Sequence, residues 1–290
     1  MDSIESMGAT TLRLWRLAVY LAWTLPLMPV QALGIALRQK WAASFPRFYH
    51  RVCCRILGLR VRQIGQPTAR RPVLFAANHV SYLDITVLGS LIPGSFIAKA
   101  EVSGWPLLGW LAKLQRSVFV DRQVRSTAQQ RDAIAERLAA RDALILFPEG
   151  TSSDGNRVLP FKSALFDVAN GRGGLPPVTV QPVSVAYTRL DGMPIRRGFR
   201  PLFAWYGDMA MAPHLWRLLG LGRIEIVVQF HDPVAFADFG SRKALSAYCE
   251  ACVVGGVNAA LTGRQQKMPG PPAPDRQHPM AADLSVVARG

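Results

Sequence analysis

Acidic residues are scarce in this sequence. Only 19 Asp and Glu stand against 34 Lys and Arg, so the formal net charge is +15. Such a balance favours an anionic partner: nucleic acid, an anionic membrane face or an acidic substrate. The basic residues are dispersed, and the absence of a basic stripe with interleaved aromatics or of a helix-turn-helix, zinc-finger or RNP pattern argues against nucleic acid. Since half of the residues are hydrophobic, a membrane surface explains charge and hydrophobicity together.

Cysteine is also rare, with four residues in the chain. Cys53 and Cys54 are adjacent, and Cys249 and Cys252 form a C-x-x-C pair inside an apparent helix at residues 242–261. Adjacent cysteines rarely pair with each other, and the C-x-x-C has neither a nearby histidine nor a second C-x-x-C to complete a zinc site. We therefore predict buried, reduced thiols and no metal site.

Two common catalytic signatures are absent. The chain has no G-x-S-x-G nucleophile elbow, which argues against a hydrolase that works through an acyl-enzyme. It has no G-x-x-x-x-G-K-[ST] loop, which argues against a nucleotide-phosphate site of that type. No internal repeat is visible in the sequence either.

An apolar run lies near the N-terminus. Residues 17–37 contain no formal charge, and these 21 residues are long enough to cross a bilayer. Pro26 and Pro29 interrupt the run, so we expect two short apolar helices with a bend. Arg16 precedes the run and Arg38 follows it, which places both ends on the cytoplasmic side under the positive-inside rule. We predict a monotopic or re-entrant anchor in the inner leaflet, with a single span or an ordinary buried hairpin as alternatives.

From residue 59 onward, short β-type runs alternate with helical patterns. Strand-like segments lie at residues 59–65, 73–77, 95–99, 117–120, 143–147, 178–186 and 223–230, and helical patterns at 83–91, 105–114 and 125–141. This alternation predicts an α/β fold with a mainly parallel central sheet flanked by helices, and with ligand chemistry at the carboxyl ends of the strands. We divide the chain into a membrane-anchoring helical segment at 1–56, an α/β domain at 57–262 and a disordered, proline-rich and polar tail at 263–290.

The stretch NHVSYLD, residues 78–84, joins a strand-like segment to a helical one. His79 therefore falls at a strand-to-helix turn, where active-site groups are common. With Ser81 as N-cap, Asp84 would stand at the third helical position, and its carboxylate would accept the Nδ1 hydrogen of His79 if the chain folds back. The free Nε2 would then act as a general base towards a bound hydroxyl. The alternative is an ordinary cap beside an ordinary loop histidine.

A second block, FPEGTSS at residues 147–153, also follows a buried-looking strand. Gly150 permits close approach of the backbone to a ligand, and Thr151, Ser152 and Ser153 offer hydroxyl groups and amides to an anionic or polar head group. Glu149 would bind an acceptor hydroxyl or support the His79 turn. A plain turn after a strand is the alternative.

Two shorter blocks complete the pattern. SVFVDR, residues 117–122, ends a strand with Asp121 and Arg122. VQPVSV, residues 180–185, is a strand that contains Pro182, and proline suits an edge strand or a pocket wall better than the middle of a sheet.

Together these four blocks resemble those of the glycerolipid acyltransferase family typified by lysophosphatidic acid acyltransferase. NHVSYLD is similar to the N-H-x-x-x-x-D motif of that family, SVFVDR to its second block, FPEGTSS to its F-P-E-G-T-R-S block and VQPVSV to its fourth. The resemblance extends over residues 72–187, and an upstream anchor is also typical of the family.

The resemblance implies an acyltransferase domain that moves a fatty acyl group from an acyl carrier protein or coenzyme A thioester to a lysolipid hydroxyl. No other cofactor is implied, and the protein would work on membrane lipids at the cytoplasmic face of the inner membrane. His79 would be the base and Asp84 its orienting partner. The substrate-binding positions would be Asn78, Arg122, Glu149, Gly150, Thr151, Ser152, Ser153 and Lys162.

Two positions depart from the family pattern. Arg116 stands where glycine is common, and Ser152 stands where an arginine would clamp the acceptor's phosphate. Other basic residues, Lys162 among them, would replace that arginine if the acceptor is lysophosphatidic acid. Alternatively the acceptor lacks the phosphate, since FPEGTSSDGNRVLPF resembles the form in lyso-ornithine lipid acyltransferases. A non-catalytic lipid-surface protein of the same fold is the competing class, and the presence of both His79 and Asp84 argues against it.

Two further segments are rich in large apolar residues. Residues 105–111 are predicted to line an acyl-chain groove or to dip into lipid, with packing on the sheet as the alternative. Residues 209–221 are a second candidate for a helix that touches the membrane.

Overall fold

A single mixed sheet forms the centre of the protein. The computed structural model describes residues 10–120, 128–170 and 177–264, and within them nine strands are paired in the order β1-β8-β6-β2-β5-β3-β4, with β7 and β9 on β6. The strands are β1 (Leu59–Ile64), β2 (Val73–Ala77), β3 (Ser95–Lys99), β4 (Val118–Val120), β5 (Ala143–Leu146), β6 (Thr179–Leu190), β7 (Met193–Pro194), β8 (Ile224–Phe230) and β9 (Val234–Ala235). All seven predicted strand-like segments are present.

The sheet is mainly parallel, as predicted. β6, β2, β5, β3 and β4 run parallel to their neighbours, and β1 is parallel to β8. The exceptions are the antiparallel pairings of β6 with β8, β7 and β9, and the first of them reverses β8 and β1 relative to the other long strands. Because β2 and β5 are parallel neighbours, their carboxyl ends lie next to each other.

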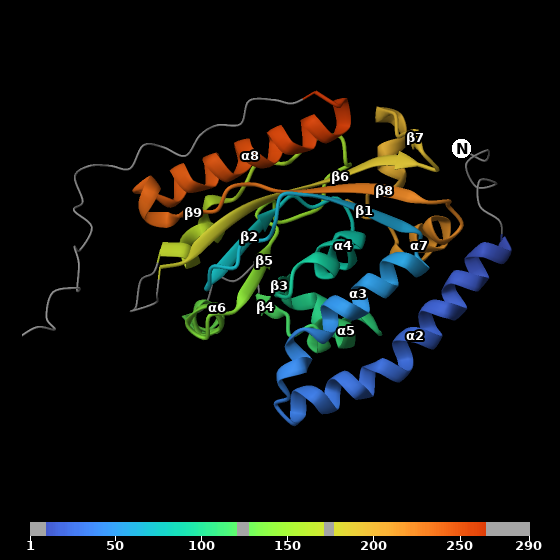
Figure 1. Cartoon of the computed structure of the whole chain (residues 1–290), viewed down its shortest axis with the longest axis horizontal. Helices are drawn as coiled ribbons and strands as arrows, with labels where there is room; N and C mark the ends of the chain where they lie inside the picture. The colour runs from blue at the N-terminus through green and yellow to red at the C-terminus, as the bar shows by residue number, and fades with distance from the viewer. Residues whose placement is uncertain (1–9, 121–127, 171–176, 265–290) are drawn as a thin grey trace, which may run out of the picture.

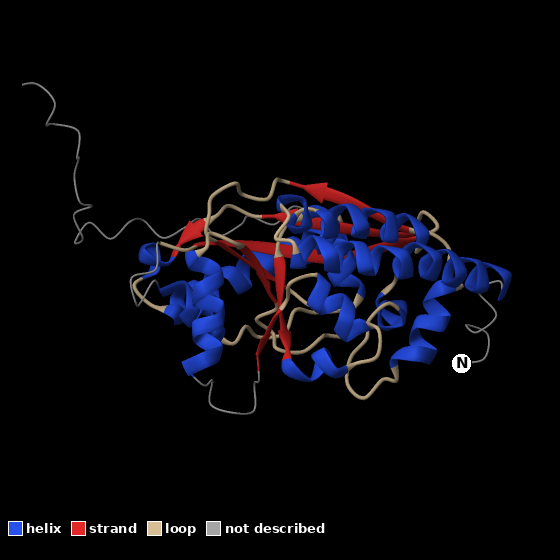
Figure 2. Ribbon diagram, turned by 90° about the horizontal axis from the view of Figure 1, so that it is seen from below, coloured by secondary structure: helices blue, strands red, loops and turns tan. Residues whose placement is uncertain are grey.

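Helices cover both faces of the sheet. They are α2 (Thr10–Ala36), α3 (Phe45–Ile56), α4 (Leu83–Leu91), α5 (Leu108–Leu114), α6 (Ala128–Ala139), α7 (Met211–Leu219) and α8 (Arg242–Thr262). α8 lies on one face, and α3, α4, α5 and α2 lie on the other (Figure 1). Each face has its own apolar core, one around Phe75 and Val87 and the other around Leu74 and Cys249. Figure 2 shows the strong twist of the sheet between these layers.

The N-terminal segment differs from the prediction. We expected two short helices, but α2 is one helix that continues from Thr10 to Ala36 through Pro26 and Pro29. A proline removes one helical N–H and crowds the preceding turn, which bends a helix but need not end it when long helical stretches flank it. α2 lies along the outside of the domain and is followed by α3, which packs against α4.

Pro182 lies in the interior strand β6 and not at the expected edge. On one side β6 pairs with β2; on the other it pairs with β9 as far as Val180 and with β8 from Val183 onward. Pro182 falls at the change of partner, and its carbonyl accepts the amide of His231 at 3.0 Å. Because N–H and C=O of one strand residue point the same way, the missing N–H would face His231, whose carbonyl instead accepts the side-chain amide of Gln181 at 2.8 Å.

The backbone conformation of Arg116 explains why the family commonly has glycine at this position. Its φ is 60°, in the left-handed region that glycine adopts without strain. The residue joins α5 to β4, and its carbonyl accepts a hydrogen bond of 2.8 Å from Arg137.

All four cysteines are free and buried, as predicted. Burial raises the pKa of Cys54 to about 11 and that of Cys53 to about 12. The predicted site residue Arg122 and most of the predicted tail lie outside the described residues.

Candidate active site

The loops that follow β2 and β5 are joined through backbone groups of His79. Its amide donates to Glu149 Oε1 at 2.7 Å, and its carbonyl accepts the amide of Ser153 at 2.9 Å. The two loops meet because the parallel strands β2 and β5 are neighbours and end at the same edge. His79 is therefore held on both sides by the second sequence block.

His79 and Asp84 form the pair that the sequence predicts. The distance from His79 Nδ1 to Asp84 Oδ2 is 2.9 Å, and the Asp84 side chain is fully buried, whereas that of His79 is 19% exposed. Because a carboxylate accepts, the hydrogen of His79 lies on Nδ1 and Nε2 keeps a free lone pair. The ring stacks on Phe147 with centroids 4.1 Å apart, which fixes its plane.

Asp84 accepts three further hydrogen bonds. The amides of Val80 and Ser81 donate to Oδ2 at 2.7 and 2.9 Å, and the hydroxyl of Tyr187 donates to Oδ1 at 2.8 Å. The predicted N-cap was wrong by one residue: α4 begins at Leu83 after Tyr82, and the Ser81 hydroxyl lies 3.4 Å from the Leu83 amide. The predicted fold-back is nevertheless present: the Asp84 carboxylate accepts the amides of Val80 and Ser81, which have no partner within the helix.

Tyr187 was missed by the sequence analysis. It lies on β6, 103 residues after Asp84, and packs against Phe203 in the core. No local motif surrounds it, and only the pairing of β6 with β2 brings it to the aspartate. Its place just after the fourth sequence block is the one available signal.

Glu149 fixes the turn with both carboxyl oxygens. In addition to the His79 amide, it accepts the amide of Leu159 at 2.9 Å. Burial raises its pKa to about 8, although these two amides and their hydrogen bonds act in the opposite direction. Of the two roles considered for Glu149, the contacts are those of support for the His79 turn.

Among the other predicted binding residues, two are tied to the backbone. The Asn78 side chain exchanges two hydrogen bonds with Val185 on β6, at 2.7 and 2.9 Å. The Ser152 hydroxyl donates to the carbonyl of Trp205. These contacts fix the ends of the two loops.

The remaining residues of the second block lie at the surface of the site. Gly150 has φ +76° and lies close to the side chain of Lys162: a Cβ at this position would come within 2.6 Å of Lys162 Nζ. The side chain of Thr151 is exposed. Gly150, Thr151 and Ser152 all line one cavity together with His79.

This cavity is a mainly apolar groove of about 620 Å³, and His79 is part of its lining. Residues of α2, α3, α5 and α7 form its walls, among them Leu17 and Leu21 of α2. Residues 105–108 and Leu111 also line it, as predicted, although α5 begins only at Leu108. From the second predicted membrane-touching segment, Leu215 faces the groove.

Comparison with known proteins gives a consistent picture. A model of the acyltransferase family matches residues 59–186. The chain is 45% identical over 252 residues to the lyso-ornithine lipid O-acyltransferase of Brucella abortus, covering 86% of this chain and 94% of that one. It is 34% identical over 194 residues to the 1-acyl-sn-glycerol-3-phosphate acyltransferase of Neisseria gonorrhoeae, covering 66% and 72%.

A solved structure has the same fold. The crystal structure of the 1-acyl-sn-glycerophosphate acyltransferase from Thermotoga maritima matches with a TM-score of 0.65 and 25% identity, over 89% of this chain and 97% of that one. The identity to relatives and the length of chain that they share show that this protein belongs to the acyltransferase family, as its four sequence blocks predicted.

Proposed function

We propose that this enzyme transfers a fatty acyl group from a thioester, carried by an acyl carrier protein or coenzyme A, to the hydroxyl of a lysolipid. The observation that carries the proposal is the His79–Asp84 pair, 2.9 Å apart, at one end of an apolar groove. A lipid chain fits the groove, and its polar end lies next to Nε2 of His79.

In the proposed reaction His79 is the general base. Nε2 takes the proton of the acceptor hydroxyl as the oxygen attacks the thioester carbonyl, because a free alkoxide is too basic to form at neutral pH. Asp84 holds the imidazole in the required tautomer and stabilises the imidazolium that forms. The thiol leaves with the proton, and no acyl-enzyme is needed.

For the acceptor we favour lyso-ornithine lipid. The relatives that carry this name are 44–45% identical over 86–87% of the chain, and Ser152 replaces the arginine that would bind a phosphate. Lysophosphatidic acid is the second candidate, since the 1-acyl-sn-glycerol-3-phosphate acyltransferases of Neisseria are 34% identical. In that case Lys162 beside Gly150 and Lys99 in the lining of the groove are basic residues that the site offers.

We propose that α2 lies in the cytoplasmic leaflet of the inner membrane as a monotopic anchor. α2 and α8 are the helices of the described chain that are long and apolar enough to span a bilayer. Within their most apolar 18 residues, 17% are buried in α2 and 50% in α8. α8 packs on the sheet, so α2 is the candidate for lipid contact. One side of α2 faces the groove, and Leu25 and Leu33 are exposed to the outside.

The test is an acyl-transfer assay with purified membranes that contain the protein. Lyso-ornithine lipid and lysophosphatidic acid are offered separately, each with an acyl carrier protein or coenzyme A thioester, and His79→Ala serves as the blank. Preference for lyso-ornithine lipid is the expected result. Preference for lysophosphatidic acid would make that lipid the acceptor. If neither lipid were acylated, the non-catalytic alternative would be supported.

A further inference from the structure

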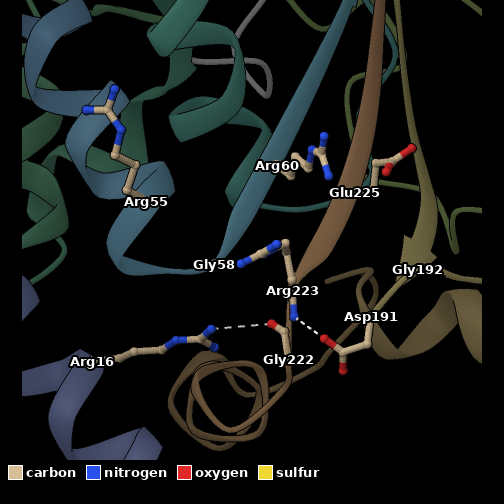
Figure 3. A pocket seen from close by; sticks show the side chains of 9 residues that line it. All are labelled: Arg16, Arg55, Gly58, Arg60, Asp191, Gly192, Gly222, Arg223 and Glu225. Carbon is tan, nitrogen blue, oxygen red and sulfur yellow. Dashed lines mark hydrogen bonds between the residues drawn. The ribbon is translucent and has the colours of Figure 1, made fainter.

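A second cavity, of about 600 Å³, lies at the end of the sheet where β1 and β8 begin. Its lining is polar and mainly basic, in contrast to the groove at His79. The nine residues around it are Arg16, Arg55, Gly58, Arg60, Asp191, Gly192, Gly222, Arg223 and Glu225. Figure 3 shows that they come from α2, from α3, β1 and the turn between them, from the turn before β7, and from β8 and the turn before it.

Arg16 is the buried member of this set. Its guanidinium donates to three backbone carbonyls, those of Leu219 at 3.2 Å, Leu221 at 2.5 Å and Gly222 at 3.3 Å. Carbonyl oxygens orient a guanidinium but do not neutralise it, and among the described residues no carboxylate lies within ion-pair distance of it. Burial accordingly lowers the pKa of Arg16, against the opposite effect of Asp191.

The other arginines of the cavity are also uncompensated. In the described part of the chain, the guanidinium groups of Arg55, Arg60 and Arg223 form no hydrogen bond or ion pair. Of the two acidic residues, Asp191 accepts the backbone amide of Arg223 at 2.7 Å within the cavity, and Glu225 lies 4.0 Å from Arg189 outside it. Four arginines against two carboxylates leave the lining with a net charge of +2.

Glycines keep the cavity open between these charges. At Gly58, with φ +73°, a Cβ would come within 2.3 Å of Arg16 Nη2, and at Gly222 a Cβ would come within 1.9 Å of Asp191 Oδ2. The arginine and the aspartate therefore lie directly against bare backbone. In Figure 3 the side chain of Arg16 reaches from α2 to Gly222, beside Arg223.

Two exposed apolar side chains are next to cavity residues in the sequence. Trp15, next to Arg16 on α2, is 68% exposed, and Met193, next to Gly192, is 73% exposed. Exposed tryptophan and other large apolar side chains beside arginines are typical of surfaces at the membrane–water boundary. The cationic lining of the cavity is thus accompanied by exposed apolar side chains that adjoin it in the chain.

We propose that this arginine-lined cavity is a binding site for a phosphate group. Guanidinium groups recognise phosphate oxygens with paired, charge-assisted hydrogen bonds, and a phosphate ester neutralises an excess of one to two positive charges. The phosphate comes from one of two sources, the head group of an anionic membrane lipid or a free phosphate ion. The site is separate from the groove at His79, and the proposal does not depend on the proposed function.

The test measures binding and not catalysis. The full chain in neutral detergent is titrated calorimetrically with short-chain phosphatidylglycerol, with short-chain phosphatidylcholine and with inorganic phosphate. The double variant R60Q/R223Q removes two positive charges from the cavity. The matched control R62Q/R70Q removes two from exposed residues outside it that form no side-chain hydrogen bond in the described structure.

We expect the dissociation constant for phosphatidylglycerol to rise at least about tenfold in R60Q/R223Q and less than about twofold in the control, with equal melting temperatures. Tighter binding of phosphatidylglycerol than of inorganic phosphate identifies a lipid head group as the source, and equal binding identifies free phosphate. Equal losses in the two double variants, or no loss in either, would overturn the proposal, because binding would then follow only the overall charge.

Discussion

The loops after β2 and β5 occupy equivalent positions at the same edge of the sheet, yet their side chains do different work. In the first loop, His79 and the aspartate that follows it face each other and leave Nε2 free. In the second, the Glu149 carboxyl accepts the His79 amide, and the Ser153 backbone amide donates to the His79 carbonyl. One loop presents the proposed general base and the other holds it in place, although both read as motifs in the sequence.

This division can be tested by the kind of loss that each loop suffers when altered. Changes in the first loop should remove the chemical step and leave the fold intact. Changes in the second should lower stability and positioning together, because its buried groups satisfy backbone amides. The following variants are ordered by the expected size of their effect on acyl transfer.

His79→Ala should lower kcat by about 10³-fold or more, because it removes the proposed general base. The side chain is partly exposed and its backbone bonds remain, so the melting temperature should change little. Acyl transfer and thermal unfolding are measured on the same preparation. If the folded variant showed normal acyl transfer, His79 would not be the general base, and the proposed difference between the two loops would be wrong.

Asp84→Asn should lower kcat by about 10²-fold, because an amide can present its N–H to His79 and favour the wrong tautomer. The Val80 and Ser81 amides would also compete for a single remaining oxygen. The measurement is kcat as a function of pH, with substrate KM as the internal comparison. A normal rate would reassign Asp84 to helix capping.

Glu149→Gln should lower kcat by about tenfold and also the melting temperature, because the NH2 group of glutamine cannot accept a backbone amide, whereas both oxygens of the carboxyl can. In the wild type, folding keeps the proton on Glu149 up to about pH 8. Its contribution to the free energy of unfolding is therefore complete below the unfolded pKa of about 4.5 and is lost as the pH rises from 4.5 to about 8.

The pH series separates support from catalysis at Glu149. Unfolding of wild type and Glu149→Gln is followed at several pH values between 5 and 8.5. The difference in stability between the two should narrow as the pH rises, since glutamine does not titrate. A stability difference that stays constant with pH would contradict the raised pKa of Glu149. If Glu149→Gln lost acyl transfer without losing stability, Glu149 would be assigned a direct part in the reaction.

Tyr187→Phe should lower kcat by about fivefold, because one of the four hydrogen bonds to Asp84 is lost. Without that donor the carboxylate interacts more strongly with protonated His79. The increase of rate with pH should therefore move to higher pH, a change that a packing role alone would not produce. An unaltered pH profile would limit Tyr187 to the core.

Thr151→Val should raise the acceptor KM by about threefold with kcat unchanged, because it replaces a hydroxyl in the groove beside His79 without changing its size. Steady-state kinetics at saturating thioester measures this. An unchanged KM would show that the second loop acts through its backbone contacts alone.

Much of the fold could be predicted from the sequence. Short, mainly apolar runs that follow Pro72 and Gly94 allowed β2 and β3 to be predicted with their correct ends, and the fold-back of Asp84 onto His79 followed from the helix start. These features depend on neighbours within a few residues. The shift of the cap from Ser81 to Tyr82 lies within the usual uncertainty of helix ends.

Contacts between distant segments were not predictable in the same way. Tyr187 meets Asp84, and Asn78 meets Val185, only after β6 has paired with β2. The place of Pro182 inside the sheet depends on where β9 ends and β8 begins. No pattern along the chain encodes these choices, because strand order is decided by packing of the whole sheet.

The wall that α2 contributes to the groove has a kinetic consequence. If the helix rests in the membrane as proposed, a lysolipid passes from the bilayer to His79 by sideways diffusion and never enters bulk water. The rate then depends on the mole fraction of lysolipid in the surface. Adding inert lipid at a fixed total amount of substrate would slow the enzyme by dilution in two dimensions, whatever the volume of the solution.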